Sequence, residues 1–330
     1  MQTKDYREEY NKYLLEIEEF LSGYTIPQEP FSLYEPFHYI ITGGGKRIRP
    51  VLTMLCCGAA GGNPENALRP AAAIEILHNF TLVHDDIMDK SPLRRGRQTV
   101  HQKWNEATAI LTGDVMVGSA YNLLPTSKEH QRSDEIKQAF TRGLIEVCEG
   151  QAYDTQFDAM DTVSISDYIM MIEKKTARLL ETCALVGGHC GYADEKTLLA
   201  LKDFANALGL GFQVQDDLLD LTADQTKFGK KVGQDIIEGK KTFLIIKALE
   251  TITSGVGKDL LNQFIENKGL SEEYVPAFRN LFEQFGILNS AQEQIEFYFD
   301  KALNSLDFIA DSYHKEMLIW LLNSLNKRVY

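Results

Sequence analysis

The stretch AAIEILHNFTLVHDDIMD, residues 72–89, decides the fold of this chain. Its apolar residues return every three or four positions, at Ala72, Ile76, Phe80, Val83 and Ile87. That is the period of an α-helix with one face in a core, and no strand-type alternation interrupts it. The pattern therefore predicts a long helix over roughly residues 64–90, which carries the acidic residues of this stretch.

The same period recurs along almost the whole chain, and glycine or proline falls where helices should end. A second clear run holds Leu198, Leu201, Phe204, Leu208 and Phe212. No linker or low-complexity segment divides the sequence, so we expect residues 1–330 to form a single domain. We predict an all-α bundle of roughly ten to thirteen helices around a deep central cavity, with the longest loop at Thr222–Lys241.

The charge of the chain is acidic, with 34 Lys and Arg against 47 Asp and Glu and a net charge of −13. This balance argues against nucleic acid or an anionic membrane surface as a general partner. The basic residues are bunched, and several bunches lie beside glycines or acidic clusters, as expected of an anion site. These bunches are Lys46-Arg47-Ile48-Arg49, Arg94-Arg95-Gly96-Arg97, Lys174-Lys175, Lys230-Lys231 and Lys240-Lys241.

Compartment can be argued from the cysteines and the N-terminus. The five cysteines are an odd number without metal-type spacing, which favours a reducing environment. The N-terminus is acidic, and no run of about 18 apolar residues occurs anywhere. We expect a cytoplasmic protein without membrane insertion.

Two acidic clusters share one spacing: Asp85-Asp86-Ile87-Met88-Asp89 and Asp216-Asp217-Leu218-Leu219-Asp220. On a helix, the first and last aspartates of each cluster project from the same face. Either cluster alone could be a solvated helix face, but two in apolar surroundings are better explained by a bound cation. Mg²⁺ prefers one or two carboxylates, water and phosphate oxygens. We therefore predict that all six aspartates form a magnesium site that holds a diphosphate.

Basic elements accompany these clusters. Arg94 and Arg95 follow the first cluster, where arginine forks suit phosphate oxygens, although a salt-bridging surface loop is the alternative. The glycines at 43–45 precede Lys46 and Arg49, and we expect their backbone to approach a phosphate at a helix start. His78 lies two turns before the first cluster and could share its face, although a lone helical histidine is usually structural.

Taken in order, these motifs closely resemble those of the trans-isoprenyl diphosphate synthase (polyprenyl synthetase) family. The matches are Gly44–Pro50, Glu75–His78, Asp85–Asp89, Arg94-Arg95-Gly96, Gly113-Asp114, Lys175-Thr176, Phe212–Asp217, Phe228-Gly229-Lys230, Gly233-x-Asp235 and Glu238-Gly239-Lys240. The resemblance implies an all-α fold around a cavity, usually a homodimer. It also implies an enzyme that adds isopentenyl diphosphate to an allylic diphosphate.

The resemblance further implies a role for each matching residue. Asp85 and Asp89 would bind two magnesium ions, and Asp216 with Asp220 would support a third. The allylic diphosphate would be contacted by Arg94, Lys175, Lys230 and Lys240. Isopentenyl diphosphate would be held by Lys46, Arg49, His78 and Arg95. An allylic cation would be stabilised by the dipoles of Thr176, Gln213 and the Lys175 carbonyl.

Product length is expected to depend on Phe80 and Thr81, which lie about one helical turn before the first cluster. An aromatic floor at Phe80, a small Thr81 and the uninserted aspartate motif resemble short-chain synthases, geranylgeranyl more than farnesyl. Ordinary core packing of Phe80 is the alternative, with a neighbouring helix setting the depth.

Other functions fit the sequence less well. A farnesyl diphosphate synthase and a non-catalytic subunit of a heteromeric prenyl synthase stay open as alternatives. A class I terpene cyclase would carry an Asn/Asp-Ser/Thr-Glu second metal motif, which is absent. A helical calcium buffer would lack the basic clusters and would need an EF-hand loop.

Overall fold

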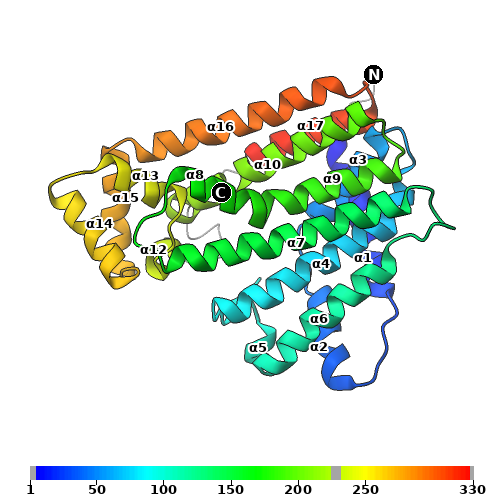
Figure 1. Cartoon of the computed structure of the whole chain (residues 1–330), viewed down its shortest axis with the longest axis horizontal. Helices are drawn as coiled ribbons and strands as arrows, with labels where there is room; N and C mark the ends of the chain where they lie inside the picture. The colour runs from blue at the N-terminus through cyan, green and yellow to red at the C-terminus, as the bar shows by residue number, and fades with distance from the viewer. Residues whose placement is uncertain (1–4, 224–231, 328–330) are drawn as a thin grey trace. The chain divides into compact units, whose positions relative to one another are not determined.

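The computed structural model describes residues 5–223 and 232–327. Regular structure in these two ranges is almost entirely helical, and the strands found there are the two short strands of one hairpin (Figure 1). The predicted all-α fold is confirmed. No helix in the described ranges is long and apolar enough to cross a membrane.

The chain divides into two compact units, which are described separately below. Unit 1 comprises Met1–Leu144, Thr182–Lys202 and Phe308–Leu318, and unit 2 comprises Ile145–Glu181, Asp203–Asp307 and Ile319–Tyr330. Four helices contribute residues to both units: α7 (Ser133–Asp158), α9 (Arg178–Cys190), α10 (Glu195–Thr222) and α17 (Tyr313–Asn326).

Unit 1 is built around α4. The elements that lie wholly in this unit are α1 (Tyr6–Gly23), α2 (Phe31–Ile41), α3 (Ile48–Ala59), the 3₁₀ turn η1 (Pro64–Ala67), α4 (Leu68–Met88), β1 (Leu93–Arg94), β2 (Arg97–Gln98), α5 (Val100–Lys103) and α6 (Glu106–Leu123). Helix α4 packs along α3 and α6, and Figure 1 shows α6 beside it. Because α4 is covered from several sides, most of its residues between 70 and 80 are buried.

The ends of α4 refine the predicted helix over residues 64–90. Its start is a 3₁₀ turn capped by Asn63, whose side chain accepts from the Glu65 N–H. Its last helical residue is Met88, and Asp89 caps the C-terminus by donating its N–H to the Asp85 carbonyl at 2.8 Å. The first acidic cluster therefore lies at the end of the helix, and not in its interior.

The hairpin that follows was not predicted. Leu93 pairs with Gln98 and Arg94 with Arg97, in antiparallel register. The two turn residues, Arg95 and Gly96, both have positive φ, at 52° and 73°. That conformation is typical of the tight two-residue turn that suits strand twist. The hairpin places Arg95 at its tip and Arg94 opposite Arg97.

Unit 2 contains the remaining elements. They are α8 (Ile165–Ile172), the π-helical segment η2 (Glu173–Ala177), α12 (Gln234–Glu238), α13 (Phe243–Thr251), α14 (Val256–Asn267), η3 (Glu272–Tyr274), α15 (Val275–Gln284) and α16 (Ile287–Ser305). The turn η4 (Leu306–Phe308) spans the boundary. Helix α13 packs against α8 and α16, and α15 also packs against α16.

A close helix approach fixes the π segment against α10. A Cβ on Gly209 would lie 2.5 Å from the Ala177 Cα, a distance that real Cβ atoms do not show. Glycine at this point of α10 lets the backbone of η2 come near. This contact aligns Thr176 of η2 with Gln213, which lies one turn further along α10.

Candidate active site

The first acidic cluster separates into two accessible aspartates and one buried aspartate. Asp85 is half-buried and Asp89 is exposed, whereas Asp86 is buried. Asp86 Oδ1 accepts from Arg94 Nε at 2.7 Å. Burial raises the pKa of the Asp86 carboxyl, and the Arg94 charge opposes that shift. Arg94, which was predicted to contact a diphosphate, is therefore paired within the protein.

Arg49 and His78 form a pair with unused donors. Arg49 Nη1 lies 3.2 Å from His78 Nε2. Burial, and then the Arg49 charge, lower the pKa of His78 well below its ordinary 6.5, so the ring is neutral at pH 7. Because arginine only donates, Nε2 accepts and the ring proton sits on Nδ1.

Each member of this pair keeps a buried N–H without a hydrogen-bond partner among the described residues: His78 Nδ1 and Arg49 Nε. Buried donors are normally satisfied, so an unpaired one asks for an explanation. Two such donors on adjacent side chains, one of them on a guanidinium, match the oxygens of an anionic ligand. The diphosphate role of Arg49 and His78 stays a prediction, for which these two donors are suited.

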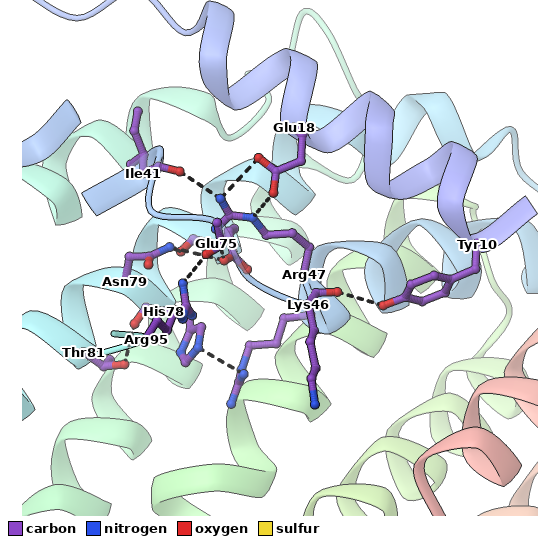
Figure 2. A network of polar contacts seen from close by, with 12 residues as sticks. Tyr10, Glu18, Ile41, Lys46, Arg47, Glu75, His78, Asn79, Thr81 and Arg95 are labelled. Carbon is purple, nitrogen blue, oxygen red and sulfur yellow. Dashed lines mark hydrogen bonds and ion pairs between the residues drawn. The ribbon is translucent and has the colours of Figure 1, made fainter. Parts of the chain in front are cut away.

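Arg47, between two predicted ligands, has a structural role that the sequence did not reveal. It is buried, and its guanidinium donates to Glu75 Oε1 at 2.6 Å, Glu18 Oε1 at 2.8 Å and the Ile41 carbonyl at 2.8 Å. Figure 2 shows the Arg47 side chain turned toward these groups and Lys46 extending in the opposite direction. Arg47 therefore holds the segment from which Lys46 projects.

The glycines at 43–45, whose backbone is predicted to approach a phosphate, lie beside guanidinium groups of the hairpin. Arg95 donates from Nη1 to the Gly44 carbonyl. A Cβ on Gly45 would lie 3.0 Å from Arg95 Nη1, and one on Gly43 would lie 3.1 Å from Arg97 Nη1. The glycines thus make room for guanidinium groups of the hairpin. Helix α3 begins at Ile48, so these glycines precede its first turn.

Tyr39 fastens the same hairpin to α2. Its hydroxyl donates to the Gln98 carbonyl at 2.9 Å, and the Arg97 guanidinium carbon lies 3.8 Å from its ring centroid. Lys103 Nζ lies 4.0 Å from that centroid. Each cation–π contact contributes about 0.5–1 kcal/mol at an exposed site. We call these contacts of Tyr39 with Gln98 and Arg97 the Tyr39 clamp. A pocket borders this clamp and is lined in part by Tyr39, Asn79, Val83, Asp86, Arg94 and Arg95.

The second acidic cluster, in unit 2, repeats the division seen in the first. Asp216 is exposed and Asp220 is half-buried, whereas Asp217 is buried. Asp217 accepts from Gln213 Nε2 at 3.1 Å, from the Tyr168 hydroxyl at 2.5 Å and from the Phe243 N–H at 3.1 Å. Burial raises the pKa of Asp217 to about 7, although these three donors oppose the shift. The middle aspartate again has protein partners.

Asp235 joins this cluster, although its sequence motif predicted no role for it. Its N–H donates to Asp220 Oδ2 at 3.1 Å. Burial, and then the charges of Asp220 and Asp217, raise the pKa of the Asp235 carboxyl well above its ordinary value, and Lys240 opposes them. Carboxylates crowded in this way are a recognised setting for a cation.

The lysines predicted to face a diphosphate have carboxylate partners. Lys175 Nζ lies 2.5 Å from Asp154 Oδ2, and Lys240 Nζ lies 2.9 Å from Glu238 Oε2. A diphosphate would share or replace these partners. Lys230 lies outside the described residues.

Lys175 and Thr176 belong to the π segment, a local widening that often marks functional sites. A Cβ on Gly150 would lie 2.2 Å from the Lys175 nitrogen, so the bulge packs closely against α7. Thr176 Oγ1 donates to Gln213 Oε1 at 2.9 Å, which unites two residues predicted to stabilise a cation.

Phe80 and Thr81 lie on α4 as predicted. Phe80 is buried and meets His84 edge-on at 4.7 Å between ring centroids. Thr81 is half-buried, and its hydroxyl donates to the His78 carbonyl at 2.8 Å.

The donor set fits Mg²⁺ in chemistry. In the part of the chain that the structure describes, no three His, Cys, Asp or Glu side chains are already gathered around one point. Mg²⁺ seldom uses such an all-protein cage and takes one or two carboxylates with water and phosphate oxygens. Each cluster has first and last aspartates that solvent can reach, which is that kind of partial donor set.

Comparisons with known proteins point in one direction. A family model described as polyprenyl synthetase matches residues 30–281. A geranylgeranyl diphosphate synthase of Methanosarcina mazei is 36% identical over 302 residues, 91% of each chain. A short chain isoprenyl diphosphate synthase of Methanocaldococcus jannaschii is 40% identical over 81% of this chain and 80% of its own. The crystal structure of a Pyrococcus horikoshii geranylgeranyl pyrophosphate synthetase matches with a TM-score of 0.90 at 33% identity, covering 98% of this chain and 100% of that one.

Proposed function

The chain belongs to the polyprenyl synthetase family, and on that premise we propose that it condenses isopentenyl diphosphate with allylic diphosphates to make geranylgeranyl diphosphate. The observation that carries the proposal is the repeated cluster geometry, with accessible outer aspartates and a middle aspartate bonded to protein in each unit. Support for the product comes from relatives at 36–38% identity that are named geranylgeranyl synthases.

The outer aspartates, Asp85, Asp89, Asp216 and Asp220, would hold Mg²⁺, which we propose as three ions in each active site. Bound Mg²⁺ supplies charge stabilisation to the oxygens of the departing diphosphate. Asp86 and Asp217 would support the outer aspartates through their protein partners. A matching second layer of hydrogen bonds commonly orients metal ligands.

The allylic half of the reaction needs a dry, oriented pocket. The allylic C–O bond breaks, and its electron pair leaves with the diphosphate, which Lys175, Lys240, Lys230 and Arg94 would bind. The resulting cation would be stabilised by the Lys175 carbonyl, Thr176 and Gln213. Excluding water matters because hydrolysis of the cation is the competing outcome.

The isopentenyl half needs positioning and not activation. Arg49 Nε and His78 Nδ1 would donate their unpaired hydrogens to the diphosphate of isopentenyl diphosphate, with Lys46 and Arg95 adding charge. The double bond then attacks the allylic cation and forms the new C–C bond. A proton leaves the adjacent carbon, and the released diphosphate is its acceptor. Holding both partners in line is the main contribution of these residues.

Product analysis tests the proposed function. Dimethylallyl, geranyl and farnesyl diphosphate are each offered with labelled isopentenyl diphosphate and Mg²⁺, and the products are separated by chromatography. We expect geranylgeranyl diphosphate from all three. Farnesyl diphosphate as the end product would favour the farnesyl synthase alternative. No turnover by the purified chain would favour the non-catalytic subunit.

We also propose that the chain acts as a homodimer in the cytoplasm. Ile110 and Leu111 on α6 are large apolar residues with exposed fractions of 46% and 57%, which suits a surface covered by a second copy. The five cysteines, all within the described residues, form no disulfide, in keeping with a reducing compartment.

Replacing Phe80 with Ala is expected to shift the products to longer chains, because it removes the largest side chain one turn beyond the first cluster. Chromatography of the products from farnesyl diphosphate measures the change. Val83→Ala is the matched control. It also opens space beside α4, but on the face of the helix that carries Asn79 and Asp86 and not on the face of Phe80. An unchanged product profile in Phe80→Ala would remove Phe80 from this role.

Replacing Tyr39 with Leu is expected to raise KM for isopentenyl diphosphate about tenfold, because the hairpin that carries Arg95 loses its clamp. KM for the allylic substrate should change little, because Arg94 of the same hairpin is held separately by Asp86 of α4. Tyr39→Phe keeps the ring that Arg97 and Lys103 contact and should retain most of the affinity. Equal effects on both substrates, or none in Tyr39→Leu, would contradict this role for the clamp.

A further inference from the structure

A chain of hydrogen bonds in unit 2 runs from Tyr168 through Asp217 and Gln213 to Thr176. The Tyr168 hydroxyl donates to Asp217 Oδ2, Gln213 Nε2 donates to Asp217 Oδ1, and Thr176 Oγ1 donates to Gln213 Oε1. The Phe243 N–H completes the shell of Asp217. These contacts join α8, α10, the π segment and the first residue of α13 in one network.

The chemistry of a carboxylate fixes the direction of every bond in this chain. The Tyr168 hydroxyl and the Phe243 N–H both donate to Asp217 Oδ2, and Gln213 turns its amide nitrogen toward Oδ1, so Asp217 is the acceptor in all three bonds. The amide oxygen of Gln213 therefore faces Thr176. A hydroxyl has a single proton, and Thr176 donates it to that oxygen. The remaining lone pairs of Thr176 Oγ1 and Gln213 Oε1 are then left for another group.

We propose that Asp217, held by Tyr168, sets the polarity of this network so that Thr176 and Gln213 present oxygen lone pairs to the allylic cation. The inference rests on the proposed function, in which these two residues face that cation. Without a fixed acceptor at its far end, the amide could flip and the threonine hydroxyl could turn its proton toward the positive charge. The dipole would then oppose the reaction.

Burial makes this direction stable and electrostatically important. Tyr168, Asp217 and Thr176 are 2%, 6% and 9% exposed. In such a setting hydrogen bonds polarise one another, and a preoriented dipole acts more strongly than in water. Tyr168 is itself held in place, because α8 begins with a capping box between Ser164 and Asp167. Tyr168 is therefore a positioning residue that acts through Asp217.

The Tyr168→Phe variant tests the proposal. It removes one hydroxyl and keeps the ring that packs near Phe243. We expect kcat to fall about tenfold, less than the loss typical of a donor that touches the reacting atoms. KM for both substrates and the Mg²⁺ concentration for half-maximal activity should not change, because Tyr168 is buried and its hydroxyl donates to Asp217.

Tyr298→Phe is the matched control. Tyr298 is a buried tyrosine of α16 in the same unit, 6% exposed, and is not part of the network. Both variants should lose a similar amount of thermal stability, whereas only Tyr168→Phe should lose kcat. Equal kcat values in the two variants would overturn the proposal. Activity of the unaltered protein separates the failures, since an inactive wild-type chain would refute the proposed function itself.

A double-mutant cycle tests the route through Gln213. In a Gln213→Leu background, Tyr168→Phe should have no further effect on kcat, because the connection to Thr176 is already broken. Additive losses would contradict the relay. If Tyr168→Phe does not fold, Asp217→Asn serves instead. Its amide can donate to Gln213 and reverse the chain, so kcat should fall, and an unchanged kcat would overturn the proposal.

Discussion

Replacing Asp89 with Asn is expected to lower kcat by about 10³ or more, while the free energy of unfolding changes little. The loss follows because the amide cannot supply the negative oxygen that a hard cation requires, and several kcal/mol of charge stabilisation depend on that cation. The fold should survive because Asp89 is exposed and caps α4 through its backbone N–H. Steady-state kinetics with farnesyl diphosphate, together with thermal unfolding, measure both quantities.

Asp86→Asn is the informative partner of that variant. Asp86 is buried against Arg94, so its replacement leaves the arginine without its charged partner and should lower the unfolding temperature. The two aspartates lie three residues apart in one motif, but replacing Asp89 should lower kcat, whereas replacing Asp86 should lower the unfolding temperature. Activity retained in Asp89→Asn would show that the exposed carboxylate does not hold a catalytic metal.

Arg47→Met is expected to destabilise the protein by about 3–5 kcal/mol. The substitution keeps an apolar stem but leaves Glu75, which is 2% exposed, without its cation, and it removes the donors to Glu18 and the Ile41 carbonyl. Denaturant unfolding followed by circular dichroism on the full chain measures the loss.

Lys46→Met controls for position and charge. Lys46 is exposed and next to Arg47 in sequence, so its replacement should change stability by less than about 0.5 kcal/mol. It should instead raise KM for isopentenyl diphosphate. If the two variants unfold alike, the Arg47 network does not have the structural role assigned to it.

Helical periodicity predicted the large elements well and their ends less well. The run around residues 72–87 became α4 within a few residues of the predicted bounds, and the run at residues 198–212 lies within α10. The period reports which face is buried, but the last turn is set by local bonds such as the Asp89 cap. The hairpin at Arg94–Arg97 could not be predicted from periodicity, because strands of two residues are too short to show an alternating pattern.

Spacing alone predicted the same role for all three aspartates of each cluster, whereas the structure buries one of them and leaves the other two accessible. Asp86 accepts a hydrogen bond from Arg94, eight residues away, and Asp217 accepts one from Tyr168, at a separation of 49 residues. Such partners depend on tertiary contacts that spacing cannot supply. The same limit hid Arg47, whose partners Glu18 and Glu75 lie 29 and 28 residues from it.

The central claim is that the accessible aspartates of each cluster hold divalent cations, with a diphosphate among the remaining ligands. A crystal structure with Mg²⁺ and a non-ionisable allylic diphosphate analogue tests it most directly. We predict oxygens of Asp85, Asp89, Asp216 and Asp220 at about 2.1 Å from Mg²⁺ ions. An analogue bound away from these aspartates, or ions held by only one of the two clusters, would contradict the account.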